Sequence, residues 1–168
     1  VCHQCWLMQL EEFASPGEIF AEEYAYFSSY SDSWLEHARK YAHQMSDMLS
    51  LGANNLVVEI ASNDGYLLQW FKEKNIPVLG VEPAGNVAAA ALEKGIRTEV
   101  VFFGTDTARQ LVQQYGQADL LLGNNVLAHV PDINDFVGGM KIMLNQSDTL
   151  TMEFPHLQRL IEENQFDT

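Results

Sequence analysis

Two short apolar runs in this sequence each contain or precede a carboxylate. The run from Leu56 to Ile60 carries Glu59, and the run from Val78 to Val81 is followed by Glu82. Short runs rich in β-branched residues are typical of parallel strands buried on both faces. Because the carboxyl ends of parallel strands meet at one edge of a sheet, the acidic residues predict a nucleotide-like ligand site at that edge.

The loop after the first run reads Ser62, Asn63, Asp64 and Gly65 before a helix-like segment. Gly65 allows a close turn, and the first turn of a helix offers unpaired backbone N–H groups to a ligand. We expect Ser62 and these amides to face a carboxylate, and Asp64 to accept from an ammonium group. A dinucleotide fingerprint requires three glycines, so this loop disfavours pyrophosphate.

Glu82 follows the first loop by roughly twenty residues, the spacing at which an acidic residue binds ribose hydroxyls in nucleotide-binding sheets. Its carboxylate is expected to accept from both hydroxyls of a ribose. The alternative is that Glu82 only begins a turn with Pro83.

Two asparagines, Asn124 and Asn125, end a further apolar run. Amides both donate and accept, which suits the zwitterionic amino-acid part of a ligand; the alternative is that they only shape a turn. His129 is interpreted either as a contact in the site or as a packed, hydrogen-bonded side chain. Asp132 is expected to cap the next helix.

Phe102 and Phe103 follow the predicted third strand. One ring is expected to stack on a base, a contact worth on the order of 1 kcal/mol, with Asp106 accepting from the exocyclic amine of that base. The alternative is that both rings belong to the core.

Five segments together resemble class I S-adenosylmethionine (SAM)-dependent methyltransferases, and among them the C-methyltransferases of nucleotide-linked deoxysugars. These segments are Glu59–Gly65, Gly80–Pro83, Gly123–Val130, Asp132–Phe136 and Glu153–His156. The first two are generic to methyltransferases, whereas the strings Asn-Asn-Val-Leu-Ala-His-Val and Glu-Phe-Pro-His are more particular to that branch. The resemblance spans nearly the whole chain and implies methyl transfer to a sugar carbon beside a ketone.

The resemblance also assigns site residues. It implies SAM contacts from Glu59, Ser62, Asn63, Asp64, Gly65, Glu82, Pro83, Phe102, Phe103, Asn124, Asn125 and His129. The family's Tyr-His-Glu-His cluster, which carries its general base, is expected beyond Thr168. Within this chain His129, Glu153 and His156 are the remaining catalytic candidates, and the catalytic residue itself stays unknown.

The pair Cys2 and Cys5 has the spacing of half a zinc site. The resemblance implies that residues 1–31 are a remnant of an N-terminal zinc-binding module with an aromatic leader, followed by a partial methyltransferase core over residues 32–168. The fragment is expected to be truncated at both ends. Alternatively, the two cysteines are free or oxidised thiols. The leader from Tyr24 to Ser31 is expected either to cover the cofactor or to pack on the first helix.

The composition indicates which classes of partner the chain binds. The 168 residues carry 23 acidic and 9 basic side chains, a formal net charge of −14. Such a balance disfavours nucleic acid and favours a small-molecule substrate, with a sugar nucleotide the expected partner. No apolar run is long enough to span a membrane, so we expect a cytoplasmic protein. The oligomeric state stays open.

Strand and helix patterns alternate through the rest of the chain. Ser33 and Glu36 suggest a capping box that opens the first long helix. Strands are predicted at 56–61, 77–82, 97–101, 118–123 and 148–154, and helices at 65–74, 84–94, 105–115 and 132–144. This alternation predicts an α/β, Rossmann-like parallel sheet with helices on both faces, an incomplete class I methyltransferase core.

Three functions fit these patterns. The first is C-methylation of a nucleotide-linked keto-deoxysugar, with this fragment retaining mainly the SAM-binding half. The others are O- or N-methylation of another small acceptor by the same fold, and a noncatalytic SAM-binding module.

Overall fold

The alternation of strands and helices is present in the computed structural model, which describes residues 2–4, 15–20 and 24–164. The helices and strands, in chain order, are α1 (Pro16–Ile19), the 3₁₀ turn η1 (Ser28–Tyr30), α2 (Asp32–Met48), β1 (Val57–Ile60), α3 (Leu68–Glu73), β2 (Val78–Val81), α4 (Gly85–Glu93), β3 (Thr98–Glu99), α5 (Thr105–Tyr115), β4 (Ala118–Asn124), the 3₁₀ turn η2 (Leu127–His129), α6 (Ile133–Met143), β5 (Leu144–Glu153) and α7 (Leu157–Glu162).

The five strands form one sheet in the order β3-β2-β1-β4-β5, and every neighbouring pair is parallel. All four residues of the central strand β1 are buried. β1 is therefore covered on both faces, and Val57, Val58 and Ile60 give it the apolar pattern that predicted it from the sequence.

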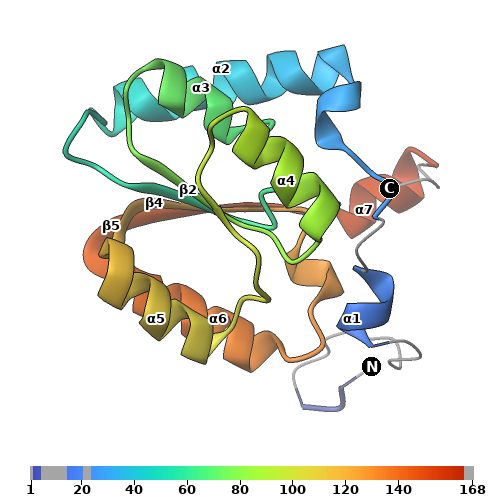
Figure 1. The fold of residues 1–168 in the computed structure, drawn as a ribbon. Helices are drawn as coiled ribbons and strands as arrows, with labels where there is room; N and C mark the ends of the chain where they lie inside the picture. Colours follow the sequence, from blue (N-terminus) through green and yellow to red (C-terminus); the bar gives the residue numbers. More distant parts are fainter. Residues whose placement is uncertain (1, 5–14, 21–23, 165–168) are drawn as a thin grey trace.

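Helices cover both faces of this sheet, as predicted. Figure 1 shows α2 and α3 above the sheet and α5 and α6 below it. The core on the α2 and α3 side contains Ala38, Ala42, Met45, Val57, Tyr66, Leu67, Leu68, Phe71, Ile76, Ala91, Ile96, Leu120 and Leu122. The core on the other side contains Val58, Ile60, Leu79, Val81, Ala108, Leu111, Ala118, Leu121, Phe136, Met140 and Met143.

Helix α2 begins two residues earlier than the predicted capping box. Ser31, not Ser33, is its cap, because the Ser31 hydroxyl accepts from the Trp34 backbone N–H at 3.3 Å. Glu36 pairs with Arg39 and Lys40 on the same helix instead of reaching back to the cap. The capping-box prediction was wrong in this respect, because Ser31 caps the helix although Trp34, and not Glu or Gln, stands three positions later.

The two edge strands differ most from the predicted bounds. β5 begins at Leu144, directly after α6, whereas the sequence predicted a start at 148. Its first residues, Asn145, Gln146 and Ser147, are exposed, so they carry no hydrophobic pattern. β3 has only two residues, Thr98 and Glu99.

The predicted helix ends are confirmed at Gly95 and Gly116, which have φ angles of 70° and 88°. Only glycine adopts this left-handed region without strain, so it ends a helix there. Among the helices of the described residues, none combines the length and apolar character needed to cross a membrane.

Candidate ligand site

A cavity of about 890 Å³ lies at the carboxyl edge of the sheet. It is formed by the residues at the ends of β1, β2 and β4, the segments after β3 and η2, and the described parts of the leader. Its lining includes Ile19, Phe20, Tyr24, Tyr26, Ser28, Trp34, Ala61, Asn63, Tyr66, Glu82, Pro83, Phe102, Phe103, Asn124, Asn125, His129, Asp132, Asp135 and Phe136. This volume lies within the range of small-molecule and cofactor sites.

The charged groups of the cavity are acidic. Glu82, Asp132 and Asp135 line it, and none of the described lining residues is Lys or Arg. The Thr105 hydroxyl and backbone N–H lower the pKa of Asp135 by hydrogen bonding, so that carboxylate stays ionised at neutral pH. The cavity therefore favours a ligand with positive charge and disfavours a bound phosphate.

Glu82 is held rigidly at the end of β2. One carboxylate oxygen accepts from the Asn63 backbone N–H at 2.9 Å and the other from the Ala84 backbone N–H at 2.9 Å. Burial raises the pKa of Glu82, and these two N–H groups oppose the shift. Each carboxylate oxygen retains acceptor capacity beyond its one backbone bond, so the side chain is able to accept from a ligand as well. The chain bends at Pro83, and Glu82 lines the cavity at the same place.

The amide at the end of β4 has a defined orientation. Asn124 donates through Nδ2 to the Tyr66 hydroxyl at 3.2 Å, which leaves its amide oxygen as an acceptor. Asn125 has a φ of 51°, and its backbone N–H donates to the Glu153 carbonyl at 2.7 Å. Asn124, Asn125 and His129 all line the cavity, whereas Asp132 also caps α6 as expected.

The two phenylalanines after β3 have different surroundings. Phe102 lines the cavity, is 47% exposed and meets the Phe20 ring edge-on, with ring centroids 6.5 Å apart. Phe103 also lines the cavity but packs edge-on against Phe136, with ring centroids 5.3 Å apart. Asp106 is not among the lining residues and pairs with Arg109 on the exposed side of α5, contrary to its predicted role.

Of the four loop residues predicted to contact the ligand, Ser62, Asn63, Asp64 and Gly65, three are absent from the lining. Asn63 lines the cavity, but the Ser62 hydroxyl is buried beside Gly80, and a Cβ on that glycine would lie 2.4 Å from it. Asp64 is 3% exposed and pairs with Lys94 at 3.1 Å. Both side chains therefore point away from the positions expected for contacts to a carboxylate and an ammonium group.

Gly65 turns the chain toward α3 with a φ of 74°. A Cβ at this position would lie 2.4 Å from the Ile96 Cδ1 atom and 3.4 Å from the Ala91 Cβ atom. The glycine is required by packing against α4 and the segment before β3. It does not line the cavity.

Glu59 is fully buried on the α2 and α3 side of the sheet and does not line the cavity. No backbone N–H or cation of the described residues bonds to its carboxylate oxygens. Burial raises the pKa of Glu59 well above its ordinary value; the nearby Tyr66 hydroxyl opposes the shift, and the charges of Glu82 and Asp64 add to it. Glu59 is therefore separated from the cavity in this structure, and its predicted contact with SAM stays a prediction.

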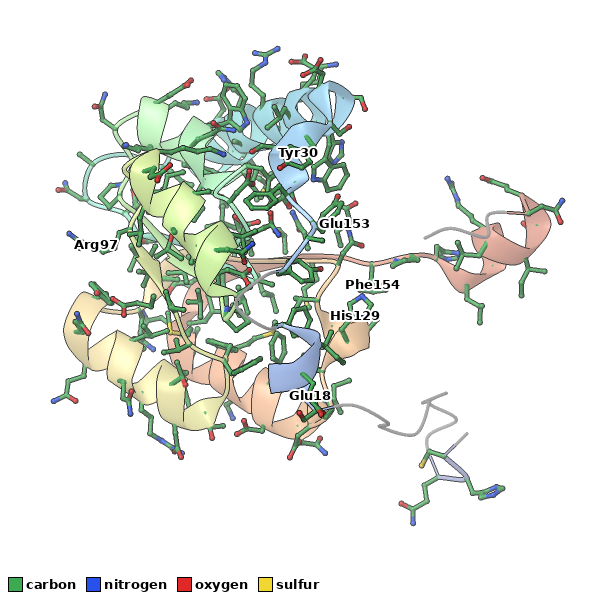
Figure 2. All side chains as sticks on the ribbon, turned by 45° about the vertical axis from the view of Figure 1, so that its right-hand side comes forward. Glu18, Tyr30, Arg97, His129, Glu153 and Phe154 are labelled. Atoms are coloured by element: carbon green, nitrogen blue, oxygen red, sulfur yellow. The ribbon has the colours of Figure 1, made fainter. Side chains whose placement is uncertain are left out.

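Two of the three catalytic candidates, Glu153 and His156, also lie outside the cavity lining. Figure 2 shows Glu153 where β5 leaves the sheet toward α7, on the opposite side of the molecule from Arg97. The Glu153 carboxylate lies 3.7 Å from His37 Nε2. His156 is exposed and caps α7, accepting from the Arg159 backbone N–H at 3.4 Å. Of the three candidates, only His129 faces the cavity.

The leader supplies the lining residues Tyr24, Tyr26 and Ser28, which the sequence did not assign individually, and Phe20 before it also lines the cavity. The signal was the cluster of aromatic residues, which left cofactor cover and helix packing equally open. Of the predicted zinc half-site, Cys5 lies outside the described residues. Within residues 2–4, 15–20 and 24–164, no group of three or more His, Cys, Asp or Glu side chains is arranged to hold a metal ion.

Known proteins resemble this chain in sequence and in fold. The chain is 34% identical over all 168 residues to the C-methyltransferase NovU of Streptomyces niveus and spans 40% of its length. It is similar to the solved structure of PH0226 from Pyrococcus horikoshii OT3, with a TM-score of 0.62, 16% identity, and coverage of 83% of this chain and 62% of that one.

A second similar structure is the plantazolicin methyltransferase BpumL, solved with a substrate analogue and S-adenosylhomocysteine. Its TM-score is 0.59 at 10% identity, with 80% of this chain and 52% of that chain covered. No family model matches the sequence. The chain thus has the Rossmann-like fold of class I methyltransferases, as expected.

Proposed function

We propose that the cavity binds SAM and that the protein is a SAM-dependent methyltransferase. The observation that carries this proposal is a cavity in which the described lining residues carry acidic but no Lys or Arg charge. It is bounded by the buried Glu82 carboxylate, the oriented amide of Asn124 and the ring of Phe102. SAM has a matching set of groups: a ribose, a cationic sulfonium, an ammonium group and a planar base.

Each side chain has a distinct role in this proposal. Glu82 accepts from the ribose hydroxyls, the amide oxygen of Asn124 accepts from the ammonium group, and Phe102 stacks on the adenine. SAM, when bound, supplies an electrophilic methyl group. The side chains of this chain would bind and orient it and exclude water, so that a bound acceptor reacts as if in the same molecule.

We propose a small carbon acid as the methyl acceptor, most specifically a nucleotide-linked keto-deoxysugar. The similarity to NovU supports C-methylation, and the Gly123–Val130 and Glu153–His156 strings support the sugar class. Among the described residues of the lining none is Lys or Arg, so the nucleotide diphosphate of such an acceptor would lie outside this cavity. His129 is the proposed contact to the reacting part of the acceptor.

Calorimetry with S-adenosylhomocysteine tests the cofactor proposal. Glu82→Gln replaces one acceptor oxygen by a donor and is expected to weaken binding by about 1.5–3 kcal/mol, roughly tenfold to more than a hundredfold. Glu93→Gln on the exposed end of α4 is the matched control and should bind normally. Well-folded wild-type protein that does not bind this ligand would overturn the proposal.

Transfer of labelled methyl from SAM then separates the three functions. Label on a keto-deoxysugar nucleotide carbon supports C-methylation, and label on oxygen or nitrogen of another small acceptor supports the second function. Binding without transfer to any acceptor supports a SAM-binding module.

A further inference from the structure

Residues 24–30 cross the cavity between α1 and α2, and Figure 1 shows this blue segment beside the carboxyl edge of the sheet. Tyr24, Tyr26 and Ser28 line the cavity. This segment, which we call the strap, contains no helix or strand except the short turn η1 at Ser28–Tyr30. Its position therefore depends on contacts with the rest of the chain.

The first contact is made by Asn86 at the start of α4. Its Nδ2 donates to the Tyr24 carbonyl at 2.7 Å, and its Oδ1 accepts from the Tyr24 backbone N–H at 3.2 Å. One side-chain amide thus satisfies both backbone polar groups of Tyr24, as a neighbouring strand would.

Asn63, in the loop after β1, makes the second contact. Its Oδ1 accepts from the Ser28 backbone N–H at 2.9 Å, and its Nδ2 donates to the Tyr26 carbonyl at 3.1 Å. The residue is 7% exposed and has a φ of 50°, a left-handed conformation that asparagine tolerates better than most residues. Its own backbone N–H donates to Glu82. Asn63 thus joins the strap to the carboxylate at the end of β2.

Lys94 makes a third contact from the end of α4. Its ammonium group donates to the Ser29 hydroxyl at 2.8 Å and also bonds to the carboxylate and the carbonyl of Asp64, at 3.1 and 2.9 Å. The buried Asp64 carboxylate thus anchors the lysine that reaches the strap.

We propose that Asn63 and Asn86 are positioning residues whose side-chain amides hold the strap over the cavity, and that Asn63 couples the strap to Glu82. The part concerning the ligand rests on the proposed SAM site. Because the same residue contacts both Glu82 and the strap, a ligand bound to Glu82 favours the closed strap, and the closed strap slows ligand release.

Amide hydrogen exchange of the protein without ligand tests the hold on the strap. Asn63→Gly removes the side-chain amide but keeps the left-handed backbone, and Asn86→Ala removes the other amide. Exchange of the Ser28 and Tyr24 amides, respectively, should accelerate on the order of tenfold, whereas core amides in β1 and β4 should not change.

Two variants control for the substitutions themselves. Asn75→Gly changes a second left-handed asparagine, with a φ of 58°, in an exposed turn. Asn134→Ala changes the second residue of α6, as Asn86→Ala changes the second residue of α4. Neither control should alter strap exchange. If Asn63→Gly and Asn86→Ala also leave it unchanged, the proposal is overturned.

The second readout is ligand release. Dissociation of S-adenosylhomocysteine from Asn63→Gly and Asn86→Ala should be several-fold faster than from the controls at a similar melting temperature, and the ligand should slow strap exchange in the wild type. Equal dissociation rates in all variants would overturn the coupling. If wild-type protein does not bind this ligand, the proposed function fails, and exchange without ligand still decides whether the strap is held.

Discussion

The ends of β1 and β2 differ although both carry a glutamate beside a short apolar strand. Glu59 is the third of the four residues of β1 and pairs in register with Gly80 and Leu122, so its side chain points into the core on the α2 and α3 side. Glu82 comes one residue after β2, where its carboxylate reaches the cavity and accepts two backbone N–H groups.

This difference shows what an acidic residue near a strand end does. Inside the strand, its direction is fixed by the alternation of side chains, and the helices over the sheet bury it. Just past the strand, it is free to turn toward the ligand edge. We therefore expect changes at the end of β1 to alter folding, and changes at the end of β2 to alter ligand binding.

The largest effect is expected from Gly65→Ala, in the loop that follows β1. The added methyl group meets Ile96 at 2.4 Å on a backbone with positive φ. Left-handed strain and overpacking together should lower the free energy of unfolding by about 2–4 kcal/mol. Urea denaturation measures this change.

Gly85→Ala at the start of α4 is the matched control, because a Cβ there meets nothing within 4 Å. A loss of stability from Gly65→Ala no larger than that of this control would contradict the view that the β1 end is a packed structural unit.

The second largest effect is expected in the pH dependence of the free energy of unfolding, which Glu59 influences. Its pKa is raised above the ordinary value of 4.5 in the folded protein, so the folded state binds more protons than the unfolded state above that pH. The wild type should therefore lose stability as pH rises from about 4.5 toward the folded pKa, by up to about 1.4 kcal/mol per pH unit. Glu59→Gln does not titrate, so its advantage should grow between pH 5 and pH 8.

Urea denaturation of both proteins at the two pH values measures this difference. The titratable neighbours of Glu59, namely Glu82, Asp64, Tyr66 and Tyr41, are present in both proteins, so their own titration largely cancels. Glu93→Gln is the exposed control. Parallel pH profiles for wild type and Glu59→Gln would show that Glu59 is ionised in the folded protein.

The smallest effect is expected at Tyr66, which belongs to the core on the α2 and α3 side and also lines the cavity. Its ring stacks on Trp34 with centroids 5.9 Å apart, and its hydroxyl accepts from Asn124. Tyr66→Phe keeps the stacking but releases the Asn124 amide, which should weaken S-adenosylhomocysteine binding by about 1 kcal/mol, roughly fivefold. Tyr115→Phe removes a tyrosine hydroxyl that bonds to Glu99 away from the cavity lining, and it is the control for calorimetry. If wild type and Tyr66→Phe bind S-adenosylhomocysteine with equal affinity, the assignment of Asn124 to the site is contradicted.

The local pattern was sufficient for the elements of the sheet. Val57, Val58 and Ile60 formed an apolar run because a central parallel strand is covered on both faces, and Gly95 and Gly116 marked helix ends because they take positive φ. The predicted strand bounds were wrong where pairing with an adjacent strand, and not the hydrophobic period, determines where the strand begins. Leu144 begins β5 by pairing with Ala118, which no local signal reports.

The candidate site was predicted in part. Glu82, Asn124 and Asn125 line the cavity as expected, since residues just after parallel strands meet at one edge. Ser62 and Asp64 do not, because a loop of a few residues sends successive side chains to different sides. Ser62 meets Gly80 and Asp64 meets Lys94, both distant in sequence.

The order of apolar and polar residues along the chain was enough to determine the parallel α/β sheet and the edge that bears its cavity. These follow from periodicities of two and 3.6 residues, which are local. Only the tertiary structure decided that Glu59 is buried while Glu82 is presented to the cavity, and that Asn63 and Asn86 hold residues 24–30. Such outcomes depend on contacts between segments far apart in the chain, whose geometry no local pattern contains.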